Sequence, residues 1–341
     1  MEDRTRAHPA LGLFAQRGSN DRFVGVVLPG DRVLAWSDVA SGDSTASARD
    51  VGDLTDDWDA ASRVLDRIDR GSSFTEAFKH VDLDRLDVYA PIARPRQVIC
   101  IGANYRKHVI DLVVAQGAGA DTEGMTVDER RAHVAARTDK RAREGIPYAF
   151  PKLNGSVCGP HDDIVVPRDA EQFDWELELG VVIAKPAWRV PRSTALGVIA
   201  GYLIVNDLTR RELVYRSDLK SLGSDWLRAK SGPGFMPTGP LIVPARYVPD
   251  PQALHLRLTL NGKVMQDEST SDMLFDVARQ IEYLSSYVRL GPGDIIATGS
   301  PAGNGMHHGR FLKPGDLLES TITGDGVDLG RQSARCVAEV V

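Results

Sequence analysis

The sequence is poor in cysteine and contains no long apolar run. Its three cysteines, Cys100, Cys158 and Cys336, are far apart and have no metal-ligand spacing. This favours reduced, mostly buried thiols over a disulfide framework. No apolar segment reaches the length of a membrane span, and Met1-Glu2-Asp3-Arg4 lacks the apolar region of a signal peptide. We therefore expect a cytoplasmic protein with no membrane partner.

Basic charge is also limited. Lys and Arg number 41 against 47 Asp and Glu, a net charge of −6, and no long basic run is present. This argues against nucleic acid as a partner. The hydrophobic fraction of 42% is that of an ordinary globular protein, and 341 residues are enough for a substantial core, which predicts one small and one large domain.

The most informative stretch runs from Phe173 to Ile183. Its second half is rich in Leu, Val and Ile and predicts a buried strand. Residues two apart in a strand point to the same face, so Glu176 and Glu178 present neighbouring carboxylates. The pair alone is equally consistent with an edge strand that carries two solvated glutamates.

A third acid favours a metal site over that alternative. Asp207 ends a second apolar run that begins at Gly201. Three carboxylates at strand ends form an oxygen-rich site of the kind preferred by Mg²⁺, or alternatively Mn²⁺ or Ca²⁺. Glu176, Glu178 and Asp207 are therefore the candidate metal ligands.

The chain resembles the fumarylacetoacetate hydrolase superfamily. The resemblance rests on short motifs that follow one order between about residues 95 and 325: Gly102-Ala103-Asn104-Tyr105-Arg106-Lys107-His108, Asp174-Trp175-Glu176-Leu177-Glu178-Leu179, Gly201-Tyr202 through Asp207, Thr209-Arg210-Arg211-Glu212, Lys230-Ser231, Pro237-Thr238-Gly239-Pro240, Asn261-Gly262-Lys263, and Pro292-Gly293-Asp294 running into Thr298-Gly299-Ser300-Pro301. Several short matches in one order make a chance resemblance improbable.

The pattern of elements predicts an α+β chain. Strands flank Pro29-Gly30 and Asn261-Gly262 as hairpins, a helix covers Trp58 to Ile68, and alternating β-α units are absent. The resemblance adds a mixed β-sandwich roll for the catalytic domain and a homodimer. We expect a small N-terminal α+β domain over 1–92 and the catalytic domain over 93–341.

Four further segments yield expectations. Met273, Val277, Ile281, Leu284 and Val288 predict one core-facing helix, and residues 295–297 predict a strand. His307-His308 resembles a metal-ligand pair, but adjacent histidines point apart, and the carboxylates already account for a hard metal. Residues 112–149 are the least family-like; their glycines and thin apolar support predict a lid, with a solvated surface helix as the alternative.

A candidate general base lies on the helix predicted to begin near Asn104. His108 and Asp111 are three residues apart and share a helix face, so the carboxylate is expected to orient the imidazole for activation of water. The alternative is a surface helix with an incidental histidine. Relatives that hydrolyse C–C bonds commonly have Glu after this His, and Asp111 is one methylene shorter.

The resemblance assigns the remaining site residues. Lys230 becomes a cation near the metal that stabilises an enolate or holds a substrate carboxylate, and the register after Asp207 selects Arg211 rather than Arg210. Val214 stands where the family often has Gln, which is expected to alter substrate contacts. Thr298 and Gly299 end a strand where a hydroxyl and a backbone can approach substrate.

The expected function is metal-dependent hydrolysis of a C–C bond in a small 2-oxo or 1,3-dicarbonyl acid, such as an acylpyruvate or a fumarylacetoacetate-like compound from aromatic catabolism. A decarboxylase, tautomerase or hydratase of 2-oxo acids would use the same metal site. A non-catalytic metal-binding subunit is the alternative from another class, and such a subunit would need neither a general base nor Lys230.

Overall fold

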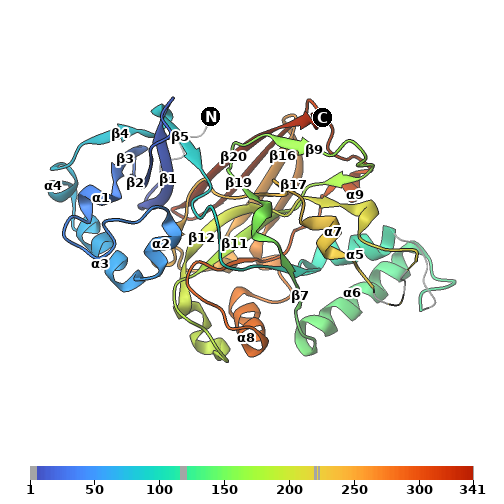
Figure 1. Ribbon diagram of the computed structural model, residues 1–341. Helices are drawn as coiled ribbons and strands as arrows, with labels where there is room; N and C mark the ends of the chain where they lie inside the picture. Colours follow the sequence, from blue (N-terminus) through green and yellow to red (C-terminus); the bar gives the residue numbers. More distant parts are fainter. Residues whose placement is uncertain (1–5, 116–120, 219–220, 222, 341) are drawn as a thin grey trace.

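The computed structural model describes residues 6–115, 121–218, 221 and 223–340 (Figure 1). A smaller N-terminal part, blue in Figure 1, lies beside a larger part that contains the rest of the chain. Within the described ranges, no helix combines the length and apolar character needed to cross a bilayer.

The N-terminal part is built on an antiparallel five-stranded sheet. Its strands, in spatial order, are β4 (His80–Asp82), β3 (Arg32–Ala35), β2 (Arg22–Leu28), β1 (Ala10–Gln16) and β5 (Leu86–Tyr89). Four helices accompany the sheet: α1 (Trp36–Val39), α2 (Val51–Thr55), α3 (Trp58–Asp69) and α4 (Ser72–Thr75). The hairpin at Pro29-Gly30 and the helix from Trp58 are confirmed.

A six-stranded mixed sheet forms the centre of the larger part. Its spatial order is β15 (Val243–Pro244), β12 (Ile199–Asn206), β11 (Leu177–Ile183), β18 (Ile295–Ala297), β6 (Val98–Gly102) and β7 (Tyr148–Lys152). Only the β18–β6 pair is parallel. That pair joins segments nearly 200 residues apart in the chain, so the sheet is assembled from distant parts of the sequence.

A second large sheet packs beside the first. Its spatial order is β17 (Lys263–Ser269), β16 (His255–Leu260), β19 (Leu317–Gly324), β20 (Val327–Ala338) and β9 (Ile164–Val166). Two short pairs complete the strands: β10 (Phe173–Asp174) with β13 (Thr209–Arg210), and β14 (Met236–Pro237) with β8 (Val157–Cys158). The expected α+β architecture with a mixed β-sandwich roll is confirmed.

The main core lies between these two sheets. Leu177, Leu179 and Val181 on β11 join Leu256 and Leu258 on β16 in one buried apolar cluster. Because side chains alternate along a strand, the even-numbered residues of β11 face the other way. The burial of Leu177 and Leu179 on one side therefore fixes Glu176 and Glu178 on the opposite side.

Helices and short turns surround the sheets. The remaining helices are α5 (Arg106–Ala115), α6 (Val127–Glu144), α7 (Trp226–Lys230), α8 (Val277–Tyr287) and α9 (Gly305–His308). The 3₁₀ turns are η1 (Leu83–Arg85), η2 (Asn154–Ser156), η3 (Arg192–Val198), η4 (Arg211–Leu213), η6 (Ala245–Tyr247), η7 (Pro251–Ala253) and η8 (Thr270–Asp272). The hairpin around Asn261-Gly262 and the strand over 295–297 are confirmed.

One helix is shorter than expected. The apolar stripe predicted a helix from Met273 to Val288, but α8 begins at Val277. Asp276 caps it, because its carboxylate accepts a hydrogen bond from the amide of Arg279 at 2.8 Å. The helix ends before Val288, whose backbone is extended. The two outer members of the stripe therefore contact the core from outside the helix.

The 112–149 segment contains all or part of three elements. It includes the end of α5, the whole of α6 and the first two residues of β7, while residues 116–120 lie outside the described part. Thr126 and Glu129 form a reciprocal capping box at the start of α6. Val134 is fully buried, and α6 packs along α5. The segment therefore depends on packing between α6 and α5, as its few apolar residues predicted.

Candidate active site

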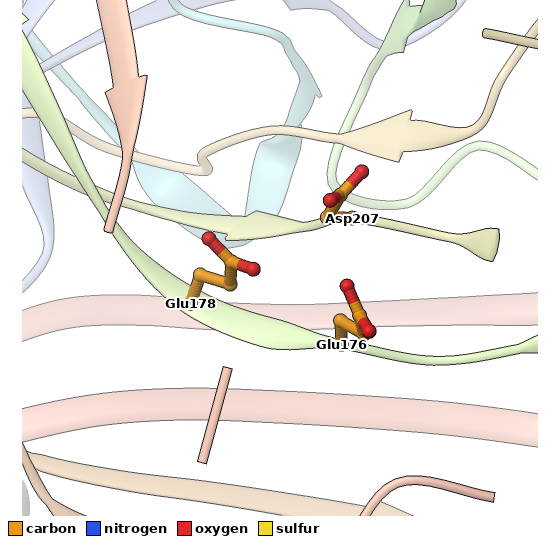
Figure 2. A group of neighbouring side chains, drawn as sticks. All are labelled: Glu176, Glu178 and Asp207. Atoms are coloured by element: carbon orange, nitrogen blue, oxygen red, sulfur yellow. The ribbon is translucent and has the colours of Figure 1, made fainter. Parts of the chain in front are cut away.

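Three buried carboxylates gather where β11 begins and β12 ends. Figure 2 shows Glu176 and Glu178 on one stretch of the chain, at the start of β11, and Asp207 on the neighbouring segment. Their oxygens lie within 4.8 Å of one another, and the residues are 7%, 2% and 1% exposed. The antiparallel register that pairs Leu177 with Asn206 produces this arrangement, and the amide of Asp207 donates to the carbonyl of Glu176 at 2.8 Å.

Two buried lysines partly neutralise the carboxylates. The Nζ of Lys230 donates to Oε2 of Glu176 at 2.5 Å and also to Oδ2 of Asp207. The Nζ of Lys152 donates to Oδ1 of Asp207 at 2.5 Å and to the carbonyl of Phe235 at 2.7 Å. When all three acids are ionised, three carboxylates and two ammonium groups leave one net negative charge, which favours a cation at this point.

Aromatic rings cover the other side of Lys230. Its Nζ lies 5.4 Å from the ring centre of Phe150 and 5.7 Å from that of Trp226. These two rings are stacked on each other with their centres 4.8 Å apart. The ammonium group is therefore held between a carboxylate face and an aromatic face.

The carboxylates differ in how easily they ionise. Burial raises the pKa of Glu178 well above its usual value, and the negative charges of Asp207 and Glu176 raise it further. Burial acts in the same direction on Glu176, but Arg211 and Lys230 reverse the effect and lower its pKa. A cation beside Glu178 would offset the cost of its buried charge. The donor set thus fits a hard divalent ion with oxygen ligands.

Arg211 links Glu176 to a fourth buried acid. Its guanidinium donates to Asp174 at 2.8 Å and to Oε1 of Glu176. Asp174 is fully buried and also accepts hydrogen bonds from the amides of Gly305 and Met306. Arg211 therefore lies at the site, as the family register predicts. Arg210 lies away from the site and donates to Glu212 at 2.8 Å.

His108 reaches the site from α5, but the expected contact with Asp111 is absent. His108 is 8% exposed, and burial lowers its pKa to about 3. Asp111 instead pairs with Arg131 of α6 at 2.7 Å, and no hydrogen bond joins it to His108 in the described structure. Although the two residues are three apart, His108 faces the interior and Asp111 lies at the partly exposed side toward α6.

The ring beside His108 is that of His307. The two ring centres are 5.2 Å apart, and the planes are tilted by 44°. His308, the next residue, points elsewhere and contacts the carbonyl of Met265 at 3.2 Å. The sequence correctly suggested that these histidines point apart, but it gave no reason to place His307 against His108.

Thr298 and Gly299 lie at the end of β18 with their polar groups already paired. The hydroxyl of Thr298 donates to the carbonyl of Leu179 at 2.9 Å. The amide of Gly299, which has φ of +99°, donates to Oε2 of Glu178 at 2.7 Å. The fully buried Asn104 fixes this strand end by donating to the carbonyl of Thr298 at 2.8 Å. In this geometry the amide of Gly299 orients the carboxylate of Glu178.

Sequence analysis missed three residues that the structure places at the site, namely Lys152, Asp174 and His307. A strand pattern could have identified Lys152, since β7 buries Phe150 and Lys152 on one face and a lysine in that position requires a partner. Asp174 lies two residues before Glu176, so the alternation of side chains along an extended segment could have placed it on the same face. No sequence signal identifies His307, because its position depends on where α9 meets α5.

Comparison with known proteins agrees with this geometry. Residues 97–336 match the family model described as fumarylacetoacetate (FAA) hydrolase, C-terminal. The chain belongs to this family. The fumarylacetoacetate hydrolase domain-containing protein 2 homolog of Dictyostelium discoideum is 32% identical over 279 residues, which cover 79% of this chain and 78% of that protein.

Two further members of the fumarylacetoacetate hydrolase family have names that state a reaction. The rat mitochondrial oxaloacetate tautomerase Fahd2a is 31% identical over 71% of this chain and 68% of its own length. The solved fumarylacetoacetate hydrolase of Exiguobacterium antarcticum is 26% identical, with a TM-score of 0.69, and the match covers 97% of this chain and all of that one. The family therefore includes hydrolases and a tautomerase.

Proposed function

We propose that the chain is a metal-dependent hydrolase that cleaves a C–C bond in a 1,3-dicarbonyl acid such as an acylpyruvate. The observation that carries the proposal is the buried cluster of Glu176, Glu178 and Asp207, bridged by Lys230 and approached by His108. The Exiguobacterium neighbour, named a fumarylacetoacetate hydrolase, supports hydrolysis.

The charge of the site suits an anionic substrate. Glu176, Glu178 and Asp207 would hold Mg²⁺, Mn²⁺ or Ca²⁺, which would supply Lewis acidity toward two substrate oxygens. With a divalent cation added, the net charge of the carboxylates and two lysines changes from one negative to one positive. That residual positive charge complements a substrate carboxylate or the enolate leaving group.

The remaining residues have separable roles. Lys230 holds the substrate and stabilises negative charge that develops on the enolate oxygen. Arg211 keeps Glu176 ionised and in place. It is also proposed to contact the substrate. Thr298 and Gly299 shape the same end of the sheet and are proposed to contact substrate. His108 takes a proton from the attacking water, since burial keeps its imidazole neutral.

A second candidate is tautomerisation of a 2-oxo acid such as oxaloacetate. Asp111 is paired with Arg131 and does not orient His108, which leaves the proposed water-activating group without its expected carboxylate. The rat relative named an oxaloacetate tautomerase shows that this activity occurs in the family. Tautomerisation needs no attacking water, so it tolerates this arrangement better.

One experiment separates the two candidates. Wild type and His108→Ala are assayed with a panel of acylpyruvates and with oxaloacetate, each with Mg²⁺ and with Mn²⁺. Hydrolysis should fall by about two to four orders of magnitude in His108→Ala, with metal still bound. Full acylpyruvate hydrolysis by the metal-bound variant would remove His108 from the mechanism, and wild-type turnover of oxaloacetate alone would favour tautomerisation.

The assembly and location follow the same proposal. We propose a homodimer in the cytoplasm that acts in aromatic catabolism, with a small N-terminal domain over 1–92 and a catalytic domain over 93–341. A non-catalytic metal-binding subunit is the remaining alternative, and metal binding without turnover of any tested 2-oxo acid would favour it. Light scattering at several protein concentrations tests the dimer.

A further inference from the structure

Two buried ring nitrogens near the carboxylates have no hydrogen-bond partner within the part of the chain that the structure describes. They are Nδ1 of His108 and Nε2 of His307, which belong to rings whose centres are 5.2 Å apart. An unpaired buried polar atom is uncommon in a folded protein and calls for a specific explanation. Here the two unpaired atoms lie on neighbouring rings, so one explanation can account for both.

The hydrogen bonding of His307 determines which of its nitrogens carries a proton. Its Nδ1 lies 2.6 Å from Oδ1 of Asn304, a buried residue. A carbonyl oxygen only accepts, so Nδ1 is the protonated nitrogen and Nε2 has a free lone pair. If His108 is protonated on Nδ1, the two unpaired atoms form a donor and an acceptor. Direct contact or one bridging water would satisfy both.

The position of His307 is connected to the metal ligands. Asp174 accepts hydrogen bonds from the amides of Gly305 and Met306, at the start of the helix that carries His307. A side chain at position 305 would collide with this carboxylate, since an added Cβ would lie 2.6 Å from Oδ1. Arg211 then joins Asp174 to Glu176. The His307 ring is therefore held in register with the carboxylate cluster.

Charged groups act on both rings of the pair. Burial lowers the pKa of His108, the negative charge of Glu176 opposes this, and the positive charges of Arg211 and Lys230 add to the lowering. Burial lowers the pKa of His307, and the negative charge of Asp111 partly offsets this, while His308 and Arg211 add to the lowering. Asp111 thus acts on His307, although it does not contact His108.

We propose that His307 is the proton-relay partner of His108 and positions it through a bridge between Nδ1 of His108 and Nε2 of His307. This inference rests on the proposed hydrolysis, because the relay serves its water-activating step. His307 acts through His108 and does not touch the substrate. It takes the place of the carboxylate that sequence analysis assigned to Asp111.

The proton movements balance. The attacking water loses a proton to Nε2 of His108 as its oxygen bonds to the carbonyl carbon, and the Nδ1 proton of His108 passes to Nε2 of His307. When the C–C bond breaks, its electron pair enters the enolate, and the proton returns by the same route to that carbon. No oxidant, reductant or further reactant is required.

The first test does not depend on activity. Nitrogen-15 spectra of the histidine rings in the full-length protein should show both His108 and His307 protonated on Nδ1. Replacing His307 by Phe, which preserves ring volume, should change the tautomer population of His108, whereas His308→Gln should leave it unchanged. An Nε2-protonated His108 in wild type, or no response to His307→Phe, would overturn the bridge even if the protein proves to be a hydrolase.

The second test measures the relay in turnover. His307→Gln should reduce kcat for acylpyruvate at least tenfold while KM and calorimetric Mn²⁺ affinity change less than twofold; His308→Gln should match wild type. The double variant His108→Ala/His307→Gln should be no slower than His108→Ala. Wild-type kcat in His307→Gln, or multiplied losses in the double variant, would overturn the relay. A wild type inactive on every acylpyruvate would instead refute the hydrolase proposal, leaving the spectra to decide the bridge.

Discussion

At the scale of single residues, the site depends on charges that are kept together by burial. Glu176, Glu178 and Asp207 repel one another, and Lys230 and Lys152 compensate for only part of that repulsion. The excess negative charge that destabilises the cluster in the absence of metal also attracts a divalent cation.

Removal of one charged ligand should therefore weaken metal binding. We expect Glu176→Gln and Asp207→Asn each to lower Mg²⁺ and Mn²⁺ affinity at least tenfold and to abolish turnover, because each replaces a charged ligand by a neutral amide. Isothermal titration calorimetry measures this. Glu319→Gln, which alters a carboxylate paired with Arg331 on the second large sheet, is the control. Unchanged affinity in both ligand variants would contradict the three-carboxylate site.

His108 should make the stability of the metal-free protein depend on pH. Its pKa is about 3 in the folded chain, against an ordinary value of 6.5. Between these values the unfolded chain holds more protons, so the free energy of unfolding falls as the pH falls, by at most about 1.4 kcal/mol per pH unit. Above pH 6.5 this contribution is constant.

Denaturant titrations between pH 7 and 4 in a chelator test this dependence. His108→Gln should lose part of the slope. A His108→Gln slope equal to that of wild type would show that the imidazole is not buried in its neutral form.

The sequence predicted the carboxylates but not their partners, for a physical reason. Glu176 and Glu178 share a strand face, and such local periodicity can be read directly from the chain. Lys152 and His307 reach the site from β7 and α9, whose positions depend on tertiary packing. The expected His108–Asp111 contact was wrong because helical spacing identifies a shared face but not which neighbouring helix will supply a stronger partner, here Arg131.

At the scale of elements, α6 is anchored unevenly. Near its C-terminal end, Arg141 donates to the carbonyl of Ala103 at 2.7 Å, and Arg279 donates to the carbonyls of Ala142 and Gly145 at 2.6 Å each. Its N-terminal half buries Val134 and forms the partly exposed Arg131–Asp111 pair with α5. One buried valine and an exposed ion pair stabilise a helix end less than three hydrogen bonds to carbonyl groups, so we expect this half to open more easily.

If residues 112–149 form a lid, hydrogen exchange should reveal it in that half. A substrate analogue added with metal should slow amide exchange chiefly over 127–134, with less change over 138–144 and none in α3. Mass spectrometry of proteolytic peptides gives this comparison. Equal exchange with and without the analogue would support the surface-helix alternative.

Local pattern predicted most elements because most depend on near neighbours. The hairpins at Pro29-Gly30 and Asn261-Gly262 and the strand over 295–297 need only turn chemistry and alternation. The predicted 273–288 helix was too long because an apolar stripe does not mark where a helix starts. The cap at Asp276 determines that boundary.

At the scale of the whole molecule, metal binding and folding should be coupled. The ligands come from two strands at the centre of the six-stranded sheet, so an ion bound to the folded chain alone will stabilise it. At a free metal concentration one hundred times Kd, the gain is about 2.7 kcal/mol. Calorimetry should show a higher Tm with Mn²⁺ than with chelator in wild type and a smaller difference in Asp207→Asn. Equal Tm values in wild type would contradict the coupling.

The parallel pairing of β6 with β18 has a consequence for protein synthesis. On the ribosome, the first five strands are complete once residue 89 has emerged, so the small sheet can begin to form early. The central sheet cannot close until residues 295–297 are translated, because β18 lies between β11 and β6. A nascent chain therefore exposes the apolar strands β11 and β12, with their neighbouring acids, until β18 has emerged, and we expect competence to bind metal only after residues 295–297 are available.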